Sequence, residues 1–142
     1  MRAADLNPDA ALKALLEGQI TTDQGVVDVY EHASMPNDIT ADSYISLRRN
    51  GIVDTVTERG GAYRGNLALR IYCRLYTDNT ANVILTRLLA RLCEDLVDRK
   101  VSGDYFFKLN AANPITDIFV NTTSGYSEYA LNVTWRTPTA KL

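Results

Sequence analysis

The chain has 142 residues and a mass of 15.8 kDa, which is the size of one domain and leaves little room for a second. Hydrophobic residues make up 46% and charged residues 23%, with a net charge of −2 and a pI near 5.3, so the composition argues against wholesale disorder and against a dedicated basic nucleic-acid module. The longest stretch without Asp, Glu, Lys or Arg is only residues 118–127, and acidic residues interrupt the N-terminus, so we expect neither a membrane span nor a secretory signal.

The first elements are a short helix and a strand. Asn7-Pro8 supplies an N-cap and a first-turn proline for a helix over about residues 8–17, which Gly18 ends. Residues 26–30 are rich in β-branched and aromatic side chains and predict a strand. A loop-like segment, residues 33–42, follows it.

Two further strands, 44–49 and 52–57, flank Asn50-Gly51, a dipeptide that favours a type I′ hairpin turn. We therefore expect the chain to reverse there. The glycine-rich stretch 60–65 is expected to be a flexible hairpin connection, because its spacing fits neither a dinucleotide nor a phosphate-binding loop.

The remaining elements follow from alternation and helical spacing. Residues 66–76 alternate apolar with Arg and Tyr, which predicts a strand with one core face. A long amphipathic helix is predicted over about 80–98. Three closing strands are predicted at 105–110, 115–121 and 126–136.

This order predicts a single α+β domain over residues 1–142, with its core at about 8–136 and a tail at 137–142. We expect an antiparallel or mixed β-sheet, with the short N-terminal helix and the long helix packed on one face. The cysteines, Cys73 and Cys93, continue apolar stripes and are expected to be buried free thiols. The predicted core includes Leu69, Ile71, Leu88, Leu92, Leu131 and Val133.

The chemistry-bearing residues do not suggest an enzyme. His32 is the single histidine, and it has no Cys or His neighbour at metal-ligand spacing. A Ser–His or Cys–His arrangement would depend on His32 alone. We therefore expect no catalytic, metal or cofactor site, and no cofactor.

Charge is unevenly distributed along the chain. Residues 1–42 hold two basic and eight acidic side chains, whereas residues 43–93 hold eight arginines and three acids. Such segregation favours electrostatic contact between copies of the chain, because one patch can meet a different patch of the next copy. The alternative is a solvated surface on which the segregation has no role.

The polar face of strand 66–76 carries alternating Arg and Tyr, which suits either a protein interface or a nucleic acid. The RNA-recognition signature that Arg64-Gly65 begins is not completed, since Asn66 and Ala68 stand where stacking aromatics would follow. We expect a subunit or partner interface at Arg48, Arg49, Arg64, Arg70, Tyr72, Arg74 and Tyr76.

The element order resembles that of the tail terminator (tail completion) proteins of long-tailed phages, such as the minor tail terminators of lambda-like phages. The resemblance covers residues 8–136 and includes the ending Thr123-Ser124-Gly125-Tyr126 before the last strand. It implies a structural virion-assembly protein that forms a homo-oligomeric ring, a hexamer in that family, on the finished tail tube.

The resemblance also implies the location and the partners. The ring would end tube polymerisation, and would contact the tail-tube protein and the head-completion or connector protein. The protein would be found in the tail or neck of the virion, and in the host cytoplasm during assembly, with no membrane partner. DNA would be touched only while it passes through the ring lumen. Another head–tail connector, a tail-tube subunit and a nucleic-acid-binding module are the alternatives.

Overall fold

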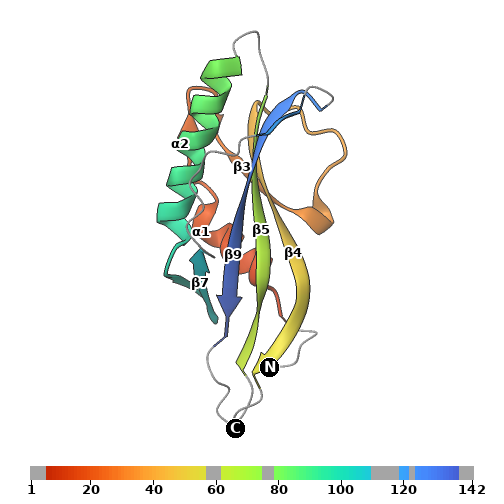
Figure 1. The fold of residues 1–142 in the computed structure, drawn as a ribbon, viewed down its shortest axis with the longest axis vertical. Helices are drawn as coiled ribbons and strands as arrows, with labels where there is room; N and C mark the ends of the chain where they lie inside the picture. The colour runs from red at the N-terminus through yellow and green to blue at the C-terminus, as the bar shows by residue number, and fades with distance from the viewer. Residues whose placement is uncertain (1–5, 57–61, 75–78, 110–118, 122–123, 138–142) are drawn as a thin grey trace.

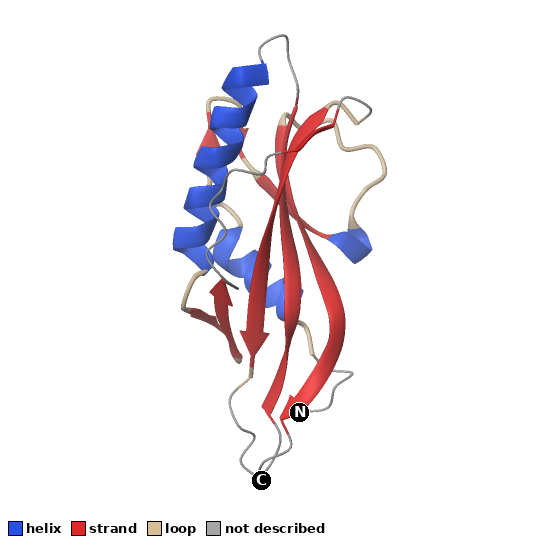
Figure 2. Cartoon of the chain, in the orientation of Figure 1, coloured by secondary structure: helices blue, strands red, loops and turns tan. Residues whose placement is uncertain are grey.

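The computed structural model describes residues 6–56, 62–74, 79–109, 119–121 and 124–137, the side chains of residues 50–56, 62, 79, 80, 119 and 121 excepted. A sheet forms one layer, and both helices pack against the same face of it (Figures 1 and 2). The two helices are α1 (Pro8–Leu16) and α2 (Asn79–Val97). The predicted α+β class, with a short and a long helix on one face, is confirmed.

The main sheet has the strand order β3-β4-β5-β9-β7-β6, and β8 also pairs with β9. Its members are β3 (Asp28–Glu31), β4 (Ser43–Val56), β5 (Ala62–Arg74), β6 (Lys100–Ser102), β7 (Tyr105–Leu109), β8 (Phe119–Asn121) and β9 (Tyr126–Arg136). The sheet is mixed, because β3 runs parallel to β4 whereas the other pairs are antiparallel. A separate two-stranded ribbon joins β1 (Thr21–Thr22) to β2 (Gly25–Val26), and a short 3₁₀ helix spans His32–Ser34.

The expected reversal at Asn50-Gly51 is wrong, because β4 continues as one strand to Val56. Pairing with β5 runs from Ser43↔Cys73 to Asn50↔Asn66 and resumes at Asp54↔Arg64, so residues 51–53 lie opposite Gly65 alone. The dipeptide therefore sits at a bulge, where an inserted segment bends the strand without ending it. Long-range pairing along β5 overrides the local turn preference, and the two strands stay paired as far as Val56↔Ala62.

The expected hairpin connection over 60–65 is wrong for residues 62–65, which belong to β5, and residues 60 and 61 lie outside the described residues. Gly65 packs against the buried Trp135 of β9, and a Cβ built on Gly65 would lie 2.8 Å from Trp135 Cζ2. Real Cβ atoms do not approach a ring that closely. The absence of a side chain at Gly65 of β5 therefore leaves the space that the Trp135 indole of the neighbouring strand β9 occupies.

The helix face that α2 buries is not the predicted one. Leu88 and Leu92 were expected in the core, yet 55% and 45% of their surface is exposed. The buried face instead includes Thr86, whose hydroxyl lies 2.8 Å from that of Ser127 and donates to the Asn82 carbonyl. Because polar residues paired within the core occupy this face, counting only apolar residues assigned the helix orientation incorrectly. The other predicted core residues are confirmed: Leu69, Ile71, Leu131 and Val133 are buried.

The N-terminal helix forms as its sequence predicts. The Asn7 side chain accepts a hydrogen bond from the Ala10 amide, Pro8 begins the helix, and Gly18 adopts a φ of 75°. Leu12 and Leu16 are fully buried, and Leu6 before the helix is buried too. Thr137, which follows the last strand, is also buried.

Both cysteines are free and buried, as predicted. Burial raises the pKa of the Cys73 thiol, and it raises that of Cys93 to about 12. Among the described helices, none is long and apolar enough to span a bilayer.

Candidate interaction surfaces

The predicted interface residues do not all lie on one surface. Alternation along the strands places Arg64, Arg70 and Arg48 exposed on the sheet face opposite the helices, and Tyr72 and Arg74 follow on the same side. Arg49 points the other way. Tyr76 lies outside the described residues.

Arg49 ties the N-terminal segment to the sheet. Its Nη2 lies 3.0 Å from Asp9 Oδ1 and donates to the Leu6 carbonyl at 2.6 Å, while Nε donates to the same carboxylate at 3.2 Å. Asp9 is buried at the start of α1, where a carboxylate also suits the helix dipole. The structure therefore gives Arg49 a role within its own chain.

Tyr72 and Arg74 belong to a cluster at one end of the sheet. The Tyr44 and Tyr72 rings stack at 4.4 Å, and Tyr126 meets Tyr44 edge-on at 5.4 Å. Arg74 Nη2 donates to the Thr40 carbonyl at 2.6 Å, and its Nε lies 3.8 Å from Asp42. Burial raises the pKa of Tyr44 to about 12. This cluster holds the segment before β4 against the sheet, so two predicted interface residues also have internal contacts.

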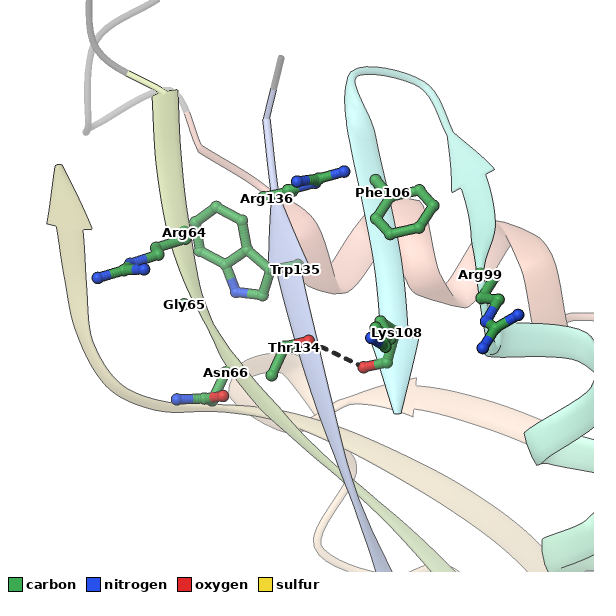
Figure 3. Close-up of a pocket in the computed structure, with 9 residues that line it drawn as sticks. All are labelled: Arg64, Gly65, Asn66, Arg99, Phe106, Lys108, Thr134, Trp135 and Arg136. Carbon is green, nitrogen blue, oxygen red and sulfur yellow. Dashed lines mark hydrogen bonds between the residues drawn. The ribbon is translucent and has the colours of Figure 1, made fainter. Parts of the chain in front are cut away.

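A basic pocket lies at the other end of the sheet, near the end of β9 (Figure 3). Register sets Arg64, Arg136 and Phe106 in one row across three strands, and Asn66, Thr134 and Lys108 in the next. Arg99, just after α2, completes the cationic lining of this pocket of about 660 Å³.

The pocket is lined by four cations, all of them exposed, and by no Asp or Glu among the described residues. The Arg136 guanidinium lies 4.9 Å from the centre of the Phe106 ring, and the Thr134 hydroxyl donates to the Lys108 carbonyl at 3.0 Å. Such a lining can bind an anion through charge-assisted hydrogen bonds.

Sequence reasoning predicted only Arg64 of these cations. The other three come from the α2–β6 connection, β7 and β9, and only strand pairing brings them together. Alternation in the last strand put Arg136 on its polar face, which was the one available signal.

A third surface is an apolar stripe on the outward side of α2. It consists of Ile84, Leu88 and Leu92, whose exposed fractions are 53%, 55% and 45%. Spacing of four residues aligns them on one side of the helix, with the exposed Arg87 and Arg91 beside them. An aligned row of exposed leucines differs from the single exposed apolar residues that any surface carries, and it is typical of a protein contact.

His32, the residue on which a nucleophile–base pair would depend, is exposed in the 3₁₀ helix. Across the described residues there is no group of three or more His, Cys, Asp or Glu side chains placed to hold a metal ion.

Neither a protein-family model nor a curated protein sequence matches the chain at a significant level. Among solved structures, the chain is similar to one from a structure described as the virion of a native gene transfer agent particle, with a TM-score of 0.54 and 15% identity. The match covers 90% of this chain and 84% of that chain. The similarity therefore concerns the fold of the whole domain.

Proposed function

We propose that the chain is a virion structural protein which forms a ring on the tail tube, ends its growth and supplies the tail side of the head–tail joint. The observation that carries this proposal is the fold similarity to a chain of a virion particle over 90% of the sequence. The resemblance of residues 8–136 to tail terminator proteins supplies the finer assignment.

The apolar stripe on α2 supports self-assembly. A ring uses heterologous contacts, in which a patch on one subunit meets a different patch on the next. Ile84, Leu88 and Leu92 provide the apolar centre that such a contact requires, and Arg87 and Arg91 provide part of a polar rim. We place this stripe at a subunit boundary, with Arg48 and Arg70, which are exposed on the sheet face, available to the neighbouring virion proteins. In this proposal the role is structural, with no catalytic step and no cofactor.

The test is tail-tube elongation followed by electron microscopy. Tubes grown with the wild-type chain should stop at a defined length and carry a ring at one end. The variant Leu88→Asp/Leu92→Asp should leave tubes growing, because two carboxylates cannot be buried in an apolar contact. Val101→Asp is a matched control, since Val101 is exposed but lies outside the stripe.

The same assay distinguishes the tail terminator from the other virion proteins that the fold similarity also allows. A tail-tube subunit would itself polymerise into tubes, and a head–tail connector would leave tube length unchanged while joining heads to finished tails. If saturating wild-type protein leaves the lengths of the tubes unchanged from those grown without it, the terminator proposal is contradicted.

A further inference from the structure

Among the described residues, no Asp or Glu pairs with the cations of the basic pocket, Arg64, Arg99, Lys108 and Arg136. The ion pairs among the described residues are Lys13–Glu17, Arg49–Asp9 and Arg74–Asp42, and none of them includes a pocket cation. Arg64 and Arg136 are moreover directly opposite each other on β5 and β9. Like charges at paired positions destabilise a sheet, so this end of the sheet is better suited to a bound anion than to water alone.

Arg99 provides a second, independent observation. It has a φ of 59°, and it is the one non-glycine residue with positive φ in the described part of the chain. The position just after a helix in this conformation strongly favours glycine, because a Cβ there crowds the backbone. An arginine held in that conformation at the pocket lining indicates that its side chain has a use.

The chain itself contains a complementary segment. Residues 14–47 contain no Lys or Arg, yet they contain six acidic residues: Glu17, Asp23, Asp28, Glu31, Asp38 and Asp42. Of these, Asp23 and Asp38 are exposed and Glu31 is half-buried, and no ion pair of the described residues includes any of the three.

This acidic segment cannot reach the pocket of its own chain. Asp28 stands opposite Tyr44, which stands opposite Tyr72, eight positions along β5 from Arg64. At about 3.3 Å per residue the two sites are roughly 26 Å apart along the strand. Figure 1 likewise shows the free end of β9 farther down the long axis than β3.

We propose that the basic pocket binds the acidic residues 23–38 of a second copy of the chain. The proposal rests on the self-association proposed above and identifies a contact that fixes the register between copies, in addition to the apolar stripe. The Arg136 guanidinium lies 4.9 Å from the centre of the Phe106 ring, and its planar N–H fork matches the geometry of a carboxylate.

A nucleic acid fits the pocket less well. The whole chain has a net charge of −2, and the rings of the pocket give no stacking platform, because Arg136 covers Phe106 and Trp135 is buried. DNA binding is therefore an outcome that the test must distinguish.

The test is a charge swap followed by sedimentation velocity at 50 mM and 1 M salt. The pocket variant Lys108→Glu/Arg136→Glu and the acidic-segment variant Glu31→Lys/Asp38→Lys should each weaken self-association at least tenfold at low salt. Both deficits should shrink at 1 M salt, where the screening length falls to about 3 Å. The variant with all four changes should recover, because the reversed charges again face each other. It is also the matched control, since its net charge equals that of the wild type.

Arg64 is left unchanged in these variants. Circular dichroism establishes that each variant is folded. Rings that assemble normally from the pocket variant, or a fourfold variant that stays dissociated, would overturn the inference while leaving the ring proposal standing. Loss of binding to a 20-base-pair DNA duplex, with assembly unchanged, would overturn it in favour of a nucleic-acid site. A wild type that stays monomeric would overturn both.

Discussion

Leu88 and Leu89 are neighbours on α2, yet truncating them should have opposite consequences. Leu89 is 1% exposed, so Leu89→Ala should lower the free energy of unfolding by about 2–5 kcal/mol. Leu88 is 55% exposed, and a fully buried leucine contributes about 1.5–3 kcal/mol, so Leu88→Ala should cost no more than about 1 kcal/mol. Alanine is also the better helix former, which reduces this cost further.

For self-association, truncation at the exposed Leu88 should have a larger effect than truncation at the buried Leu89. If Leu88 and Leu92 bury their exposed halves between subunits, these halves together equal about one fully buried leucine, so removing both side chains should cost about 1.5–3 kcal/mol per contact. That corresponds to a roughly 10- to 150-fold weaker contact. Leu89→Ala leaves the outward surface unchanged, so at temperatures where the variant stays folded its contacts should be near wild-type strength.

The assay combines urea unfolding, followed by circular dichroism, with sedimentation velocity. Unfolding is measured at concentrations where the transition midpoint no longer depends on protein concentration, because assembly would otherwise add to the apparent stability. A loss of 2–5 kcal/mol for Leu88→Ala would show that this side chain is buried in the core. Unchanged association for Leu88→Ala/Leu92→Ala would refute the placement of the stripe at a subunit boundary.

Three further predictions concern single sites. Gly65→Ala should lower the free energy of unfolding by about 1–3 kcal/mol and shift the Trp135 fluorescence, because the new methyl group would overlap the indole; a neutral substitution would contradict the close packing. Arg99→Gly should raise the free energy of unfolding by up to about 1 kcal/mol while weakening assembly. If the substitution lowers both the free energy of unfolding and the strength of assembly, Arg99 has only a structural role. The native Cys93 thiol has a pKa of about 12, against 9.0 for an exposed thiol, so its contribution to stability is complete below pH 9 and is lost as pH rises toward 12. Urea titrations should show a slope that Cys93→Ala reduces by up to about 1.4 kcal/mol per pH unit, and an identical slope in the variant would contradict this assignment.

The alternation of apolar and polar residues correctly predicted the buried faces of two long strands. The alternation of residues 66–76 and 126–136 placed Leu69, Ile71, Leu131 and Val133 correctly, because a strand with one buried face must alternate. Capping residues predicted the start of α1 for a similarly local reason. The parallel pairing of β3 with β4 was not predictable in this way, since it depends on partners brought together by the whole fold.

Two wrong predictions, the turn at Asn50-Gly51 and the buried face of α2, have physical causes that neighbouring residues in the sequence do not reveal. At Asn50-Gly51 the pairing of β4 with β5 outweighs a turn preference, and on α2 a buried hydroxyl pair takes the place where leucine was expected. The basic pocket likewise contains one cation that was predicted from the sequence and three that were not. Arg64 was among the predicted interface arginines, whereas Arg99, Lys108 and Arg136 join it only through tertiary structure.

Native mass spectrometry of the purified chain, alone and mixed with tail tubes, tests the central proposal most directly. A ring-forming tail protein should give one closed species at a fixed multiple of 15.8 kDa, and six copies would give six times that mass, or about 95 kDa. The same species should remain bound to one end of the tubes, and Leu88→Asp/Leu92→Asp should not form it. A chain that remains at 15.8 kDa at every concentration, with and without tubes, would contradict the proposed function.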